Sequence, residues 1–309
     1  MVSSRRHDAP LPSPLPPAYE QTLPVLRAAY SDRTAALMAR FSELAYVPFP
    51  TDIDAKIDDP GSLGALLAPG GFAVLHRFEW GSVQAFLAIR PGVHAVLAFR
   101  GTANPANWWT DFDLSRIAFP DYPQVQIHKG FYETFEAARR QMEAALAAVP
   151  PDVRLYITGH SLGGALAQIA SAVFARDNLA ACYTFGSPRV ANKRFDIYVK
   201  CPHYRVINHW DIVPGIPLAS PWGYQHGGDP RLLTGKRPEA ILRDDYPAAL
   251  RFFVDLAGFV PAVIQSKTGI VNDHRISNYR RQLDHIARAR GHAQKPQPAP
   301  PALQGFELR

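Results

Sequence analysis

The sequence predicts an α/β fold: a mostly parallel central sheet with an antiparallel N-terminal meander and helices on both faces. Three observations support this prediction. Residues 72–99 hold three strand-like runs separated by Gly81 and by Pro91-Gly92, as in a meander of hairpins. After residue 100, strand-like and helix-like segments alternate, which is typical of a parallel sheet with helical crossovers. A short turn with glycine on both sides joins such a strand to such a helix at residues 159–163.

Apolar periodicity places the individual elements along the chain. We expect a helix over 23–44, and loop with a short helix over 52–68. The predicted strands are 72–80, 82–90, 93–99, 153–158, 181–185, 204–208 and 222–226. Amphipathic helices are expected at 131–149, which Pro150-Pro151 ends, at 162–175, and from His274 to about Arg290.

The segments without clear periodicity set the domain organisation. Residues 1–20 and 291–309 are rich in proline and are predicted to be tails. One domain is therefore expected over 21–290. Within it, a polar segment that carries tryptophans is predicted to be a lid at about 103–120, and residues 228–272 are predicted to form a helical insert.

Composition narrows the class of protein. A hydrophobic content of 47% and a charged content of 19% suit a globular protein with a real core. The net charge of +6 is modest and is best explained by a solvated helix face, so no nucleic-acid partner is expected. Cys182 and Cys201 form no C-x-x-C pair, and we expect neither a metal site nor a cofactor. Cys182 is predicted to be a buried thiol, and a bridge between the two cysteines is left open.

The N-terminal residues suggest a location. They are charged and proline-rich without an apolar core, and no run is long enough to span a bilayer. We therefore expect a cytoplasmic or peripheral membrane protein. Secretion is left open, since removal of a leader would produce the same sequence.

The turn at residues 159–163 reads Gly159-His160-Ser161-Leu162-Gly163, a G-x-S-x-G element. On a sharp strand-to-helix turn, a serine hydroxyl is raised above the edge of the sheet, and the residues two before and two after it must be small. The N-terminus of the following helix directs N–H groups toward developing negative charge. Ser161 is therefore the candidate nucleophile.

A serine nucleophile needs a base, and the base needs an orienting carboxylate. In α/β-hydrolases these groups follow the serine in the order acid, then histidine. Asp211, directly after the strand-like run 204–208, fits the acid. Asp229, Asp244 and Asp245 are weaker candidates because no strand closely precedes them.

Two histidines compete for the role of base. His226 lies inside the last predicted strand, whereas His274 lies in a loop beyond it, where a base belongs. His274 is therefore preferred. The side chain of His160 is expected to point away from the nucleophile. His128 and His209 are expected to be structural or to line a pocket.

Two donors are expected for an oxyanion. One is the backbone N–H of Leu162, directly after the nucleophile. The other is Thr102, which follows the strand 93–99 and offers both its N–H and its hydroxyl.

These features resemble the class 3 lipase family, the fungal-lipase type of α/β-hydrolase. The matching blocks are Phe99-Arg100-Gly101-Thr102, Asn107-Trp108 through Asp111, His128-Lys129-Gly130-Phe131, Thr158-Gly159-His160-Ser161-Leu162-Gly163-Gly164-Ala165-Leu166-Ala167, Thr184-Phe185-Gly186-Ser187-Pro188-Arg189-Val190, Asp211-Ile212-Val213-Pro214, Tyr224-Gln225-His226-Gly227 and Asp273-His274-Arg275-Ile276-Ser277-Asn278-Tyr279. The resemblance implies the same nucleophile, acid, base and oxyanion donors, and implies that Asp111 holds the Thr102 hydroxyl.

The sequence determines the residues that bind the substrate less clearly than it determines the triad. Trp108 and Trp109 are adjacent, and two hypotheses stay open for them: a hinged lid that opens at a lipid surface, or rings packed beneath a fixed loop. Phe252 and Phe253 would line an acyl pocket or belong to the ordinary core. His160 is also a candidate pocket residue.

The sequence thus predicts a serine carboxylester hydrolase of lipid esters with no cofactor. The alternatives are a non-lipid carboxylesterase, a phospholipase A1-type enzyme, and a catalytically silent lipid-binding protein. The expected partner is a lipid-like ester, with transient contact to a membrane or lipid-droplet surface and no obligate protein partner.

Overall fold

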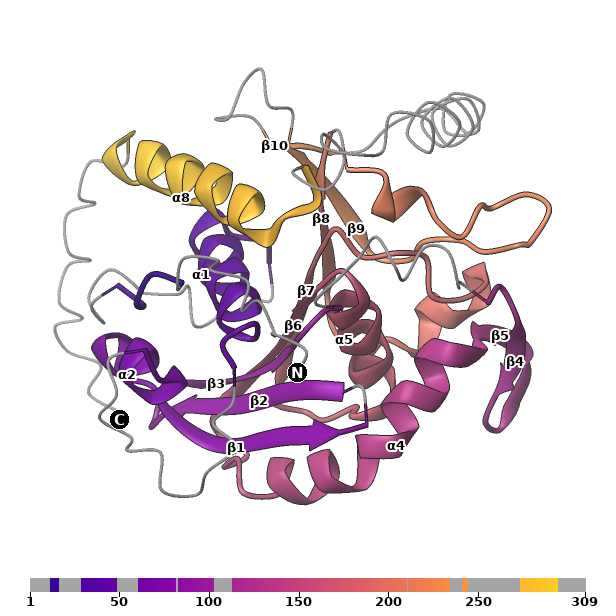
Figure 1. The fold of residues 1–309 in the computed structure, drawn as a ribbon, viewed down its shortest axis with the longest axis horizontal. Helices are drawn as coiled ribbons and strands as arrows, with labels where there is room; N and C mark the ends of the chain where they lie inside the picture. Colours follow the sequence, from indigo (N-terminus) through magenta and orange to yellow (C-terminus); the bar gives the residue numbers. More distant parts are fainter. Residues whose placement is uncertain are drawn as a thin grey trace, which may run out of the picture.

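An eight-stranded sheet forms the centre of the molecule (Figure 1). The structure, a computed structural model, describes residues 12–16, 29–48, 61–81, 83–102, 113–209, 211–233, 241–243 and 273–293. The sheet has the order β1-β2-β3-β6-β7-β8-β9-β10. Its strands are β1 (Ala73–Trp80), β2 (Val83–Arg90), β3 (His94–Phe99), β6 (Arg154–His160), β7 (Leu179–Phe185), β8 (His203–Asn208), β9 (Asp229–Leu233) and β10 (Ile241–Arg243).

The strand directions confirm the predicted α/β-hydrolase architecture. The strands β1, β2 and β3 pair antiparallel, as the meander predicted. From β3 through β6, β7, β8 and β9 every neighbouring pair is parallel, and β10 returns antiparallel to β9. The carboxyl ends of β6, β7 and β8 therefore meet at one edge of the sheet, where ligands bind in open α/β folds.

Each face of the sheet has its own core. Side chains alternate along β3, so that Leu97 and Phe99 belong to one hydrophobic cluster while Val96 and Ala98 belong to the other. The first cluster includes residues of α4 (Lys129–Leu146) and α5 (Leu162–Val173), and the second includes residues of α1 (Asp32–Leu44), α2 (Leu63–Leu67) and α8 (Ile276–Ala293). Helices thus cover both faces. The 3₁₀ turns are η2 (Ala68–Gly70), η3 (Lys193–Tyr198) and η4 (Val213–Gly215).

Helices α1 and α8 lie side by side on one face (Figure 1). Helix α1 begins at the N-cap Ser31, whose hydroxyl accepts the N–H of Thr34. Two ion pairs join the helices: Arg40 to Asp284 at 2.9 Å and Arg280 to Glu43 at 2.6 Å. This contact matters for the site because α8 begins two residues after His274.

Three parts of the fold differ from the sequence prediction. The end of the expected polar segment and the residues between it and the next predicted helix form a hairpin, β4 (Arg116–Phe119) and β5 (Tyr122–His128). Proline at positions 120 and 123 disfavours a strand, because proline has no N–H to pair with a neighbouring strand. This hairpin lies outside the main sheet, where the missing N–H is tolerated. The predicted strand 222–226 is wrong. Within it Gln225 makes an isolated bridge to Ala191, and β9 is the strand beside β8.

The third difference concerns the predicted helical insert. Two strands, β9 and β10, lie in its first part, and residues 234–240 and 244–272, which include the part with helical spacing, lie outside the described part of the chain. In the predicted N-terminal tail, Leu15 is buried and its N–H donates to the carbonyl of Leu66 at 2.9 Å. Both cysteines are free thiols, and Cys182 is buried as predicted. None of the described helices is long and apolar enough to cross a membrane.

Candidate active site

The turn at Ser161 is strained in the way that a nucleophile elbow requires. Ser161 has φ 58° and ψ −130° between β6 and α5. A Cβ on Gly159 would lie 2.1 Å from the carbonyl oxygen of Gly163, and a Cβ on Gly163 would lie 2.4 Å from that of Phe99. Only glycine fits at these two positions, which is why the elbow sequence needs both.

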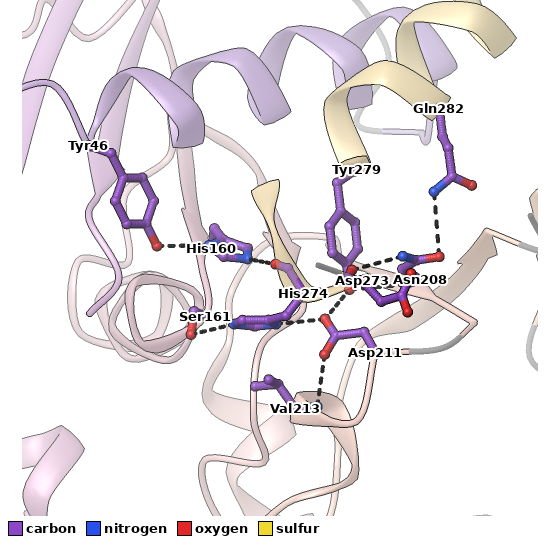
Figure 2. Close-up of polar contacts among 10 residues, drawn as sticks. All are labelled: Tyr46, His160, Ser161, Asn208, Asp211, Val213, Asp273, His274, Tyr279 and Gln282. Atoms are coloured by element: carbon purple, nitrogen blue, oxygen red, sulfur yellow. Dashed lines mark hydrogen bonds and ion pairs between the residues drawn. The ribbon is translucent and has the colours of Figure 1, made fainter. Parts of the chain in front are cut away.

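Three side chains from distant parts of the sequence form one hydrogen-bonded line (Figure 2). His274 Nε2 lies 2.8 Å from the Ser161 hydroxyl, and His274 Nδ1 lies 2.8 Å from Asp211 Oδ2. Ser161 follows β6, Asp211 follows β8, and His274 precedes α8, so the carboxyl ends of the parallel strands bring them together. Their exposed fractions are only 2%, 7% and 3%. The sequence predicted this grouping.

The carboxylate of Asp211 is held by further donors. Oδ1 accepts the N–H of Val213 at 2.9 Å, and Oδ2 also accepts the hydroxyl of Tyr279 at 2.5 Å. Burial, and then the charge of Asp211, raise the pKa of Tyr279 well above its usual value, so its hydroxyl keeps the proton it donates. Because the Asp211 carboxylate accepts from Nδ1, a His274 ring with a single proton carries that proton on Nδ1. The lone pair on Nε2 then faces Ser161.

The loop after β3 packs directly against the elbow. A Cβ on Gly101 would lie 2.5 Å from the carbonyl oxygen of His160 and 3.1 Å from Ser161 Cβ. This close approach puts Thr102, half-buried, directly after a residue in contact with the nucleophile. Leu162 begins α5, so its N–H belongs to the unpaired first turn of that helix.

The family model described as Lipase (class 3) matches residues 96–220. This range contains the β3 loop, the elbow and Asp211. Over these residues the chain is similar to the class 3 lipases.

Individual relatives match part of this chain. It is 30% identical over 157 residues to a lipase of Rhizomucor miehei (47% of this chain, 43% of that protein). It is 35% identical over 147 residues to the secreted mono- and diacylglycerol lipase 1 of Fusarium solani (45% of this chain, 44% of that protein). The chain thus spans less than half the length of these two relatives.

Solved structures share the fold. The triacylglyceride lipase of Rhizomucor miehei matches with a TM-score of 0.57 and 25% identity, over 69% of this chain and 84% of that one. A triacylglycerol lipase described as having a serine protease triad as its catalytic centre matches with a TM-score of 0.61 and 22% identity, over 80% of this chain and 95% of that one.

The other residues that the sequence offered as acid or base make contacts outside the triad. Asp229 starts β9 and forms an ion pair with Arg231. His226 Nε2 lies 2.7 Å from the carbonyl oxygen of Pro214, and burial lowers the pKa of His226 well below its usual value. His128 caps α4 by accepting the N–H of Phe131.

Most of the other predicted residues lie outside the described part of the chain. The exposed His209 donates its N–H to Leu233. The candidates that lie outside the described residues are Asp244, Asp245, Trp108, Trp109, Asp111, Phe252 and Phe253. Among the described residues, no group of three or more histidine, cysteine, aspartate or glutamate side chains could hold a metal ion.

Sequence reasoning missed two tyrosines at this site. Tyr279 lies five residues after His274 in the quoted block, on the first turns of α8, and that spacing was the available signal. Tyr46 lies just beyond α1, and its hydroxyl is 2.8 Å from His160 Nδ1. No pattern in the sequence marks Tyr46, because it reaches the site only through the packing of α1 on the sheet.

Proposed function

We propose that this protein is a serine carboxylester hydrolase of lipid esters, of the acylglycerol lipase type, working through an acyl-enzyme on Ser161. The observation that carries the proposal is the line from Asp211 through His274 to the Ser161 hydroxyl, with 2.8 Å at each of its two contacts. A serine hydroxyl becomes nucleophilic when a neutral imidazole can take its proton as it attacks.

The proposed reaction has two halves. Ser161 Oγ attacks the ester carbonyl carbon while His274 Nε2 takes the hydroxyl proton, and Asp211 stabilises the resulting imidazolium. The tetrahedral intermediate collapses as His274 gives that proton to the leaving alcohol. Water then attacks the acyl-enzyme with the same base, and the carboxylic acid leaves. No cofactor takes part in these steps.

The proposed oxyanion donors are the N–H of Leu162 and the N–H and hydroxyl of Thr102. Loss of one such donor typically costs about 2.7–4 kcal/mol of transition-state stabilisation, or roughly 100- to 1000-fold in kcat. Thr102→Val keeps the shape and the N–H but removes the hydroxyl. If the hydroxyl is a donor, Thr102→Val loses most of its kcat while Thr102→Ser keeps it.

Lipid esters are the proposed substrate class because the matched relatives are named lipases and one is named for mono- and diacylglycerols. A series of p-nitrophenyl esters from short to long acyl chains tests this choice. An optimum at long chains supports a lipase, whereas a short-chain optimum supports the non-lipid carboxylesterase. Release of fatty acid from a phospholipid would support the phospholipase A1-type alternative.

The central experiment is Ser161→Ala, with Ser171→Ala as its matched control. Ser171 is a buried serine on the same helix, and its hydroxyl donates to the carbonyl of Ala167 at 2.8 Å. Ser161→Ala is expected to abolish ester hydrolysis and Ser171→Ala to retain it. Hydrolysis that survives Ser161→Ala would overturn the proposal. Absence of hydrolysis in the unaltered protein would favour a silent lipid-binding protein.

We further propose that the lid at about 103–120 and a transient contact with a membrane or lipid-droplet surface belong to this activity. Activity on a short-chain ester is measured across the solubility limit of the ester. A rise in rate when the interface forms is expected, and a smooth saturation curve would contradict the lid.

The expected cytoplasmic or peripheral membrane location gains no support from the relatives, since the Fusarium solani protein is named as secreted. Secretion was left open by the sequence. Detection of the protein in the culture medium or in the cell pellet decides between these locations.

A further inference from the structure

His160 lies between Gly159 and the proposed nucleophile, yet its ring contacts neither the Ser161 hydroxyl nor solvent (Figure 2). Nδ1 lies 2.8 Å from the hydroxyl of Tyr46, and Nε2 lies 2.6 Å from the backbone carbonyl oxygen of His274. The ring also lies beside the ring of His274, with 4.5 Å between their centroids. His160 therefore joins a residue beyond α1 to the backbone of the proposed base.

The partners of His160 fix where its protons lie. A carbonyl oxygen only accepts hydrogen bonds, so Nε2 must carry a proton. Burial, and then the charge of His274, lower the pKa of His160 well below its usual value, so the ring is neutral and holds that proton alone. Nδ1 is therefore an acceptor, and the hydroxyl of Tyr46 donates to it. Burial raises the pKa of Tyr46 far above its usual value, which keeps this donor protonated.

The Tyr46 oxygen also accepts the backbone N–H of Gly101. A Cβ on Gly101 would lie 2.3 Å from that oxygen, so the contact requires glycine there. Hydrogen bonds thus run in one direction from the Gly101 N–H to Tyr46, from Tyr46 to His160, and from His160 to the carbonyl of His274. The chain connects the loop that holds Thr102 with the residue that holds the base.

The backbone around His274 is held at a second point. The side-chain amide of Asn208 donates to the carbonyl of Asp273 at 2.8 Å. Two successive carbonyls, at Asp273 and His274, are therefore fixed by side chains from β8 and β6. The imidazole reaches Ser161 and Asp211 together only while this backbone keeps its place, and a displacement of about 1 Å at a catalytic group costs on the order of 100-fold in rate.

We propose that Tyr46 and His160 are positioning residues, which hold the backbone of His274 and thereby set the distance between its Nε2 and the Ser161 hydroxyl. This inference rests on the proposed function. The conservative variant Tyr46→Phe removes the donor to Nδ1. The proton of His160 stays on Nε2, because the His274 carbonyl oxygen is the only acceptor left. The ring is then fixed by one hydrogen bond instead of two, so it holds the backbone of the base less firmly.

The expected result for Tyr46→Phe is a fall in kcat of about tenfold, which corresponds to the loss of roughly one hydrogen bond. Its KM is expected to stay within about a factor of two of the KM of the unaltered protein. Tyr156→Phe is the matched control. Tyr156 is a buried tyrosine on β6, the strand of His160 and four residues before it, and its ring packs edge-on against His94. Tyr156→Phe is expected to leave kcat unchanged.

Two substitutions of His160 separate positioning from simple packing. The amide of His160→Gln reaches the place of Nε2 and can still donate to the His274 carbonyl. The shorter His160→Asn reaches only the place of Nδ1. We expect the Gln variant to retain about tenfold more kcat than the Asn variant at equal thermal stability. Equal kcat in the two variants would overturn the proposal.

Two further readouts separate this inference from the proposed function. The rate at which diethyl p-nitrophenyl phosphate labels Ser161 reports its activation without ester turnover, and ¹⁵N NMR of the histidines reports the tautomer of His160. An unaltered protein that neither hydrolyses esters nor becomes labelled contradicts the proposed function. If the unaltered protein is labelled, the positioning proposal expects slower labelling of Tyr46→Phe, with the His160 proton still on Nε2. The same labelling rate in the variant and in the unaltered protein overturns it.

Discussion

The hydroxyl of Tyr279 donates to Asp211 Oδ2 at 2.5 Å, on the same oxygen that accepts from the proposed base. The oxygen of Tyr279 in turn accepts the backbone N–H of Asn208 at 3.0 Å. Asp211 is therefore fixed from α8 as well as from its own loop. The tyrosine stabilises the carboxylate in the ionised form that the imidazolium needs.

Tyr279→Phe removes this donor and leaves the packing of the ring intact. A hydrogen bond to a charged group contributes about 1.5–3 kcal/mol, so kcat is expected to fall by roughly 10- to 100-fold. Steady-state kinetics on one ester measures the change. Tyr132→Phe on α4, where the tyrosine is also buried, is the control. An unchanged kcat would mean that Val213 and His274 alone hold Asp211.

Asp211→Asn tests the tautomer of the base. The amide nitrogen of asparagine can donate to Nδ1, which moves the ring proton to Nε2, where it faces Ser161 and blocks proton uptake. A loss of about 10⁴-fold in kcat is typical for this change in a serine triad. The thermal midpoint should fall little, since the side chains have the same size. A residual activity near that of the unaltered protein would assign the acid elsewhere.

Gly159→Ala tests whether the turn at Ser161 has room for a single added methyl group. The new Cβ would lie 2.1 Å from a backbone oxygen that cannot move independently, and overpacking of this kind costs about 3 kcal/mol or more. Gly92→Ala is the control. Its Cβ meets nothing within 4 Å, so only the φ of +68° is strained, at about 1–2 kcal/mol. Denaturant unfolding compares the two variants, and equal losses would argue against the tight elbow.

Buried histidines make the stability depend on pH. Burial lowers the pKa of His94 to about 4 and that of His203 to about 3. The unfolded chain binds these protons near pH 6.5, so the native state is favoured fully above that pH. As the pH falls from 6.5 toward 4, each histidine removes about 1.4 kcal/mol of the free energy of unfolding per pH unit.

His94→Phe isolates one of these contributions. The ring of His94 packs edge-on against Phe72 and Tyr156, a place that phenylalanine suits. The free energy of unfolding is measured in urea at pH 7, 6 and 5. As the pH falls, it should decrease less steeply in the variant, by about 1.4 kcal/mol per pH unit, because one fewer proton binds on unfolding. Identical slopes in both proteins would show that His94 does not titrate in this range.

The central strands and the triad could be predicted from the sequence. The strands are marked by local patterns of apolar residues, and the triad residues occur in a fixed order along the chain. Strands such as β3 and β6 are buried on both faces, and continuous apolar runs mark them. Asp211 and His274 were found from their order after Ser161. The strands β5 and β9 were not predicted, because each contains a proline, Pro123 and Pro230. Proline is tolerated in a strand only where its missing N–H is not needed for pairing, and the sequence does not show where that is the case. Tyr46 was missed for another reason: its contact with His160 spans more than a hundred residues and no pattern reports it.

The ion pairs between α1 and α8 have a consequence for when the site is completed. His274 is carried into place by a helix that docks on the first described helix of the domain, through Arg40 with Asp284 and Arg280 with Glu43. A nascent chain that has emerged from the ribosome only as far as β10 holds Ser161 and Asp211 without a base. If the proposed function holds, ester hydrolysis begins only after the segment that carries His274 and α8 has been synthesised and has docked on α1.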